Sequence, residues 1–204
     1  MTFLLVTLNT HQYAVNTTIR LRTGCLTQRR EKRLMTKELD RKPTVKIYLA
    51  HPWFSEYQKE LTKKALSMLE KNDTVLLVHE PFTMQYKDVT LDNDPLGIFG
   101  NREWQQNTYQ NDIEAMASSD CGVFLYDMDN PDDGTAYELG WMRAMHKPAI
   151  VVPVSKGPKA DYEMNLMIAV GATAFIDGNE HFDDLETYNF NHFPSNMTSP
   201  FPVF

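Results

Sequence analysis

Residues 121–127 read Cys-Gly-Val-Phe-Leu-Tyr-Asp, an apolar run that ends on one acidic residue. A run without alternating polar residues is typical of a strand covered on both faces, as the central strands of parallel sheets are. The stretches on either side, residues 101–118 and 135–145, have the patterns of helices. The sequence therefore predicts a helix, a buried central strand and a second helix in this order.

The same alternation continues in both directions from this strand. Another helix is expected over residues 55–71, where apolar residues recur at helical spacing. Four more strands are expected at residues 45–50, 74–79, 148–154 and 173–176. This order predicts an α/β fold, a doubly wound, flavodoxin-like five-stranded parallel sheet with helices on both faces.

Ligands of such folds bind at the carboxyl ends of the strands. The polar, aromatic and turn-rich residues 80–99 make a connection longer than usual, which predicts a lid or a wall of the site.

Composition excludes several classes of function. The chain has 204 residues and a net charge of −7, so a nucleic-acid polymer would be repelled on average. Its apolar runs are far shorter than the 18 or so residues of a membrane span. The two cysteines, Cys25 and Cys121, neither form a disulfide framework nor have metal-ligand spacing. We expect a cytoplasmic protein that acts on a small molecule.

The first 43 residues differ from the rest. Residues 1–41 hold eight Lys or Arg and three acidic residues, and they lack the period of a helix or strand. We expect a basic N-terminal extension over residues 1–43, followed by one domain over residues 44–204. A disordered tail, a true translation start at Met35 and an Arg-rich transit peptide are all compatible with this composition.

An acidic cluster follows the central strand, from Asp127 to Glu138. An EF-hand calcium loop is one interpretation, but the glycine stands at position eight instead of six, and a strand precedes it in place of a helix. Capping of the next helix would account for Asp132 or Asp133. Glu138 lies one turn into that helix, where its carboxylate is either solvated or directed into the crevice at the strand ends.

A second group of candidates comes from other elements. Trp104, Thr108 and Asp112 are spaced by four and lie along one helix face. Tyr48 lies near the end of the first strand. Asn165 stands in an apolar run, where a buried amide either fastens a loop or holds a ligand.

Paired carboxyl groups suit cleavage at a sugar carbon, because one ionised carboxylate attacks while a protonated acid assists the leaving group. Glu138 would attack and Asp112 would protonate. Asp112 then needs a raised pKa, from desolvation or a nearby like charge.

Residues 45–204 resemble the nucleoside 2-deoxyribosyltransferases. The resemblance lies in the following stretches: Lys46-Ile47-Tyr48-Leu49, residues 104–112, residues 132–140, Met164-Asn165-Leu166-Met167 and the aromatic C-terminus. Residues 122–129 and 142–148 look most like the purine-specific (type I) branch.

This resemblance implies transfer of a 2-deoxyribosyl group from a 2′-deoxynucleoside to a free purine by double displacement. Glu138 would be the nucleophile, Asp112 the acid and base, and Tyr48 the residue that orients Glu138. Asp132 would hold sugar hydroxyls or the base edge. No metal and no organic cofactor would be required.

The resemblance also implies a homohexamer in which neighbouring subunits complete each site. Asn165, Met167 and the terminal carboxylate of Phe204 would then contact substrate across an interface. Relatives commonly end in Tyr, so a contact that needs the ring hydroxyl is in doubt. Trp53 and Phe82 are either stacking partners of a purine or part of the core.

Two other functions remain open. An N-glycosidase of 2′-deoxynucleosides or their 5′-phosphates would transfer the sugar to water, although acidic residues 127–134 offer no phosphate cradle. A non-catalytic nucleotide-binding protein would need only the shape of the same crevice.

Overall fold

The computed structural model describes residues 42–193 and 197–204. These residues belong to one compact unit, Lys42–Phe204. The basic extension predicted over residues 1–43 lies, apart from its last two residues, outside the described part of the chain. In the described part, none of the helices is both long and apolar enough to cross a bilayer.

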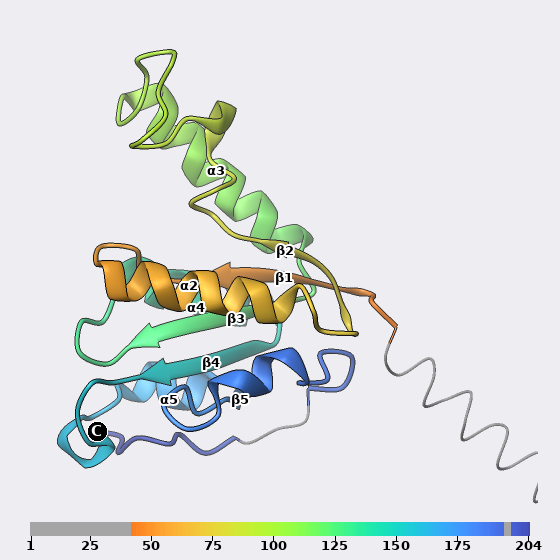
Figure 1. The fold of residues 1–204 in the computed structure, drawn as a ribbon, viewed down its shortest axis with the longest axis vertical. Coiled ribbons are helices and arrows are strands. Elements are labelled where there is room, and N and C mark those ends of the chain that lie inside the picture. Colours follow the sequence, from red (N-terminus) through yellow and green to blue (C-terminus); the bar gives the residue numbers. More distant parts are fainter. Residues whose placement is uncertain (1–41, 194–196) are drawn as a thin grey trace, which may run out of the picture. The chain divides into compact units, whose positions relative to one another are not determined.

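Five parallel strands form one sheet in the order β2-β1-β3-β4-β5 (Figure 1). Their bounds are Val45–Ala50 for β1, Val75–His79 for β2, Cys121–Asp127 for β3, Ala149–Val154 for β4 and Ala174–Phe175 for β5. This is the flavodoxin-like order, in which the chain changes direction across the sheet between β1 and β3. The predicted fold class is confirmed, and all seven residues of β3 are buried as predicted.

Each strand sends alternate side chains to opposite faces of the sheet. From β1, Ile47 and Leu49 pack under α2 (Glu56–Leu69) and the short 3₁₀ helix η3 (Phe182–Glu186). Tyr48 and Ala50 enter the other core, with α3 (Arg102–Ser118), α4 (Asp133–Ala144) and α5 (Leu166–Gly171). Helices therefore cover both faces, which leaves the strand ends as the place for a ligand.

Side-chain caps fix where the helices begin. Ser55 and Gln58 form a capping box at α2, and Asn101 caps α3. Asp132 caps α4, so this helix begins at Asp133 instead of the predicted residue 135. Each such cap stabilises its helix by about 1 kcal/mol.

One helix was not predicted from the sequence. Asn165 caps α5, whose six residues lie where only an apolar run was noted. Six residues are too few to show a helical period, so the sequence pattern did not distinguish this segment from an irregular one. Two more 3₁₀ helices, η1 (Tyr86–Asp88) and η2 (Lys159–Asp161), lie in connections.

Candidate active site

A cleft of about 270 Å³ lies at the carboxyl ends of the strands. We call it the carboxylate cleft. Its side chains come from residues 51–54 after β1, 81–85 after β2, 104–112 of α3 and 132–138 at the start of α4. The volume is close to the lower end of the range of about 300–1,000 Å³ that is usual for small-molecule sites. Its place beside β1 and β3 is the one expected for this fold.

Glu138 and Tyr48 form the central contact of the site. The Tyr48 hydroxyl donates a hydrogen bond of 2.6 Å to Oε1 of Glu138. Tyr48 is fully buried on β1, and its ring stacks on that of His79. Burial raises the pKa of Tyr48 and the charges of Glu138 and Asp112 raise it further, so the phenol keeps its proton and acts only as a donor. The carboxylate of Glu138 is thereby held in one orientation, which is the contact that the family resemblance implied.

The pKa of Glu138 is raised to about 7. Desolvation by burial is the largest cause; the hydrogen bond from Tyr48 opposes it, and the charges of Asp112 and Asp132 add to it. The carboxyl group therefore ionises around neutral pH, and as a poorly solvated carboxylate it is available for attack on an electrophilic carbon.

Asp112 faces the same cleft from α3. Burial raises its pKa to about 7, and the charge of Glu80 adds to this rise. Its Oδ1 atom is buried and has no hydrogen-bond partner among the described residues. A carboxyl group that lines a cleft, with a pKa near the working pH and an oxygen without a partner, is suited to exchange a proton with a ligand. Trp104 and Thr108 line the cleft beside it, as their spacing predicted.

Asp132 lines the cleft and caps α4 at the same time. Its Oδ2 atom accepts hydrogen bonds from the backbone N–H of Thr135 at 2.7 Å and from its hydroxyl at 2.8 Å. Of the two capping candidates in the sequence, the structure therefore selects Asp132 over Asp133. The capping role and the predicted ligand role are compatible, because the cap uses only one of the two carboxylate oxygens.

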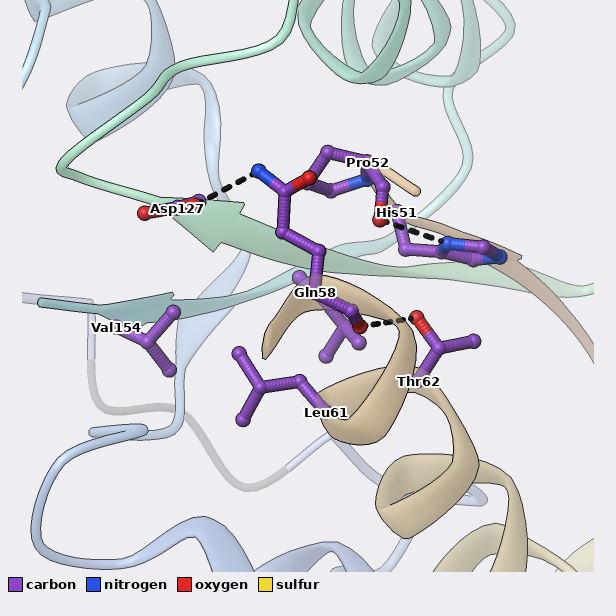
Figure 2. A pocket seen from close by; sticks show the side chains of 8 residues that line it. His51, Pro52, Gln58, Leu61, Thr62, Asp127 and Val154 are labelled. Atoms are coloured by element: carbon purple, nitrogen blue, oxygen red, sulfur yellow. Dashed lines mark hydrogen bonds between the residues drawn. The ribbon is translucent and has the colours of Figure 1, made fainter. Parts of the chain in front are cut away.

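Asp127 has a different role from the rest of the acidic segment. Gln58 donates to its Oδ2 atom at 2.8 Å, and the backbone N–H of Asp129 donates to its Oδ1 atom. Figure 2 shows this contact beside a small hollow between α2 and the strand ends, with a volume of about 10 Å³. Such a volume holds about one water molecule. Asp127 thus fastens β3 to α2 instead of facing the carboxylate cleft.

Aromatic rings form another wall of the cleft. Trp53 packs on Phe82 with 4.8 Å between ring centroids and on Phe54 with 5.3 Å. All three line the cleft, and Phe82 comes from the connection predicted to be a lid or wall. These rings offer an apolar surface on which a planar base can pack.

Three predicted site residues lie away from the cleft of their own chain. Asn165 uses its side-chain oxygen to cap α5, through a bond from the backbone N–H of Met167. Met167 is 74% exposed and Phe204 is 62% exposed. The C-terminal segment pairs with residue 164, so these residues share one surface region.

Sequence reasoning missed several cleft residues. Gln85 lines the cleft and has a buried side-chain oxygen without a partner among the described residues. His51 and Glu80 form a buried pair at its edge. The last two come directly after neighbouring strands, which is the signal that would have placed them together.

The described residues hold no group of three or more His, Cys, Asp or Glu side chains that is suited to a metal ion. Cys121 is a buried free thiol of β3, and burial raises its pKa. A buried thiol of this kind is a packing residue.

A flavodoxin-like sheet that carries two desolvated carboxyl groups in a cleft at its strand ends has the groups that an enzyme acting at a sugar carbon requires. The family model described as nucleoside 2-deoxyribosyltransferase matches residues 47–167. The chain belongs to this family, and it is an enzyme of nucleoside deoxyribosyl transfer with nucleosides and nucleobases as substrates.

Individual relatives agree with this assignment. A nucleoside deoxyribosyltransferase of Limosilactobacillus fermentum is 46% identical over 168 residues, which cover 82% of this chain and 98% of the relative. One from Lactobacillus leichmannii is 29% identical over 153 residues, covering 73% of this chain and 92% of the relative. The solved structure of a 2-deoxyribosyltransferase from Bacillus psychrosaccharolyticus has a TM-score of 0.56 and 30% identity, covering 74% of this chain and 96% of that one.

Proposed function

We propose that the protein exchanges one purine for another on 2-deoxyribose, through a covalent deoxyribosyl ester of Glu138. The observation that carries this proposal is the 2.6 Å hydrogen bond from Tyr48 to Glu138 in a cleft that also contains Asp112. One carboxyl group is oriented by a donor, and the other has a buried oxygen without a partner among the described residues.

In the first step, the Glu138 carboxylate attacks C1′ of the deoxynucleoside. The C1′–N bond breaks, its electron pair leaves with the base, and Asp112 gives its proton to that base. The ester bond between Glu138 and C1′ is formed with inversion. Tyr48 keeps its hydrogen bond to Oε1 of Glu138 and so limits the rotation of the carboxyl group.

In the second step, a nitrogen of an incoming base attacks C1′ and the ester bond breaks. Asp112, now ionised, takes the proton from that nitrogen, and Glu138 returns to its carboxylate form. Two inversions restore the configuration of the donor. A pKa near 7 suits Asp112 to give and accept the proton in alternate steps.

Substrate contacts follow from the remaining lining residues. The carboxylate oxygen of Asp132 that is not used for the cap is available to a sugar hydroxyl or a base edge. Trp53 and Phe82 offer a packing surface to the base, and Gln85 a free amide oxygen. Purine preference is supported by the resemblance of residues 122–129 and 142–148 to the purine-specific branch.

The test of the reaction is a single incubation. Purified protein with deoxyadenosine and free hypoxanthine should form deoxyinosine and adenine, as measured by chromatography. Glu138→Ala should abolish the exchange, and normal turnover by this variant would refute the proposed nucleophile. Release of free deoxyribose without deoxyinosine would establish the alternative, an N-glycosidase. Adding a pyrimidine acceptor to the same mixture tests the purine preference.

We also propose that neighbouring subunits of a homohexamer complete each site with Asn165, Met167 and Phe204. Support comes from the exposure of these residues on one surface region, beside the exposed apolar Leu166 and Val170 of α5. Light scattering should give the mass of a hexamer. The Glu138→Ala and Asn165→Ala proteins should each be inactive. When they are dissociated and mixed, some sites combine an intact Glu138 with an intact Asn165 of a neighbouring subunit, so part of the activity should return. Mixtures that stay inactive would refute shared sites.

A further inference from the structure

A buried ionic pair lies at the edge of the carboxylate cleft. His51 follows the last residue of β1 and Glu80 follows the last residue of β2, and these two strands are neighbours. The distance from Nε2 of His51 to Oε1 of Glu80 is 2.5 Å. The side chains are only 4% and 3% exposed. Charged groups are rarely buried to this extent unless they are paired.

The carboxylate of Glu80 has donors on both oxygens. The backbone N–H of Phe82 donates to Oε1 at 2.8 Å and that of Thr83 donates to Oε2 at 2.9 Å, in addition to His51. Burial acts to raise the pKa of Glu80, but the hydrogen bond and charge of His51 and the bonds from Thr83 and Phe82 hold it below its ordinary value. Glu80 is therefore ionised.

His51 stands between two hydrogen-bond acceptors. Its Nε2 faces the Glu80 carboxylate. Its Nδ1 lies 3.1 Å from the carbonyl oxygen of Pro52, a contact that Figure 2 shows. A neutral imidazole has only one N–H, whereas the imidazolium has two. Both contacts are hydrogen bonds only when His51 carries two ring protons and hence a positive charge.

This positive charge stands opposite three acidic groups. Asp112 of α3 and Asp132 and Glu138 at the start of α4 line the cleft together with His51. Among the described residues that line it, His51 alone can be cationic. Lys59 and Lys63 of α2 line another hollow with the pair, but Lys59 is half-buried and bonded to Glu56, and Lys63 is exposed and bonded to Glu60.

Resting on the function proposed above, we propose that the His51–Glu80 pair is a positioning device that holds the two catalytic carboxyl groups in opposite protonation states. The imidazolium of His51 favours the ionised form of Glu138, the nucleophile. The carboxylate of Glu80 favours the protonated form of Asp112, the acid. Neither residue of the pair needs to touch the reacting atoms.

The electrostatics of the site agree with this division. The charge of His51 lowers the pKa of Glu138 against the larger effect of burial. For Asp112, the charge of Glu80 adds to burial in raising the pKa. Burial raises both pKa values, and on top of this shared rise the charges of His51 and Glu80 act in opposite directions, which favours a nucleophile at Glu138 and an acid at Asp112.

If the His51–Glu80 pair only stabilised the structure, a different pH profile would be expected. Glu80 fastens the turn that carries Phe82, which packs on Trp53 in the cleft wall. Loss of this fastening would lower activity at every pH by the same factor. Loss of the charges would instead move the two limbs of the pH profile.

The experiment compares pH profiles of kcat/KM for purine exchange in His51→Gln, Glu80→Gln and the double variant. The double variant replaces the ionic pair with two glutamines, whose side chains can still form a neutral hydrogen bond. His51→Gln should move the acidic limb to higher pH, because Glu138 becomes harder to ionise. Glu80→Gln should move the basic limb to lower pH, because Asp112 loses its proton more easily. Each shift should be about 0.5–1 pH unit, as expected for one charge removed from a partly solvated cleft.

The double variant should show a pH optimum narrowed from both sides. Glu56→Gln, which removes an exposed carboxylate from α2, is the matched control and should leave both limbs in place. Exchange activity with unmoved limbs in the pair variants would overturn the inference and leave the proposed function intact. Absence of exchange by the unchanged protein would overturn both.

A measurement on the unchanged protein does not depend on the folding of any variant. Nitrogen NMR of His51 at pH 7 should show two protonated ring nitrogens. A neutral imidazole would overturn the inference, whatever the activities of the variants.

Discussion

Glu138→Gln should stabilise the fold while it abolishes activity. The folded protein raises the pKa of this carboxyl group from its ordinary value of 4.5 to about 7, chiefly by burial. One pKa unit corresponds to about 1.4 kcal/mol, so ionised Glu138 costs up to about 3 kcal/mol of folding free energy. The amide of Gln has no charge to desolvate, and its oxygen still accepts the hydrogen bond from Tyr48.

The sign of the pH dependence follows from the raised pKa. The folded protein binds the proton more tightly than the unfolded chain, so the cost is fully present above about pH 7 and disappears below about pH 4.5. At pH 8 the variant should melt about 6–12 °C higher than the unchanged protein, since about 1 kcal/mol shifts Tm by about 2–4 °C at this size. At pH 4.5 the two melting temperatures should coincide.

The assay is calorimetry or circular dichroism of both proteins at several pH values between 4.5 and 8.5. Glu163→Gln, which changes an exposed glutamate, is the matched control and should give no pH-dependent gain. A Glu138→Gln protein that is equally stable or less stable at pH 8 would show that Glu138 is well solvated when ionised, which would refute the desolvation argument.

Substitutions at three further residues test the rest of the site. Tyr48→Phe removes a hydrogen bond to a charged group, worth about 1.5–3 kcal/mol, so the acidic limb of kcat/KM should move up by about 1–2 pH units; an unmoved limb would contradict the orientation of Glu138 by Tyr48. Asp112→Asn should slow exchange by about 10²–10⁴-fold with an ordinary deoxynucleoside as the donor. Most of this loss should vanish with a donor whose leaving group departs without a proton. Equal losses with the two donors would exclude Asp112 as the acid. Asp132→Asn keeps the cap to Thr135 and should raise KM at unchanged Tm, whereas Asp132→Ala should also cost about 1 kcal/mol of stability; equal melting temperatures would argue against the cap.

Much of the fold could be read from the sequence because its signals are local. The apolar run 121–127 indicates a buried strand wherever its neighbours lie, and Ser55 or Asn101 caps a helix through contacts three residues away. The spacing of Trp104, Thr108 and Asp112 likewise placed three cleft residues on one helix face. Helix α5 escaped prediction because it is too short for a period.

The site could be predicted only in part. The residue types and positions of Glu138, Asp112 and Tyr48 were evident from motif and chemistry, but the contact between Tyr48 and Glu138 joins residues 90 positions apart. The choice of Asp132 over Asp133 as the cap depends on backbone geometry. Gln85 gave no signal in the sequence, since a polar residue in a polar connection is ordinary.

The sequence by itself determined the strands, most of the helices and the carboxyl groups, because periodicity, capping and residue chemistry act over a few neighbouring positions. Only the tertiary structure decided which of these carboxyl groups lose their water and which charges face them. Strand order brings His51 beside Glu80, and His51 lines the cleft of Glu138 and Asp112. Desolvation and charge pairing depend on distances through space, and those distances exist only once the chain has folded.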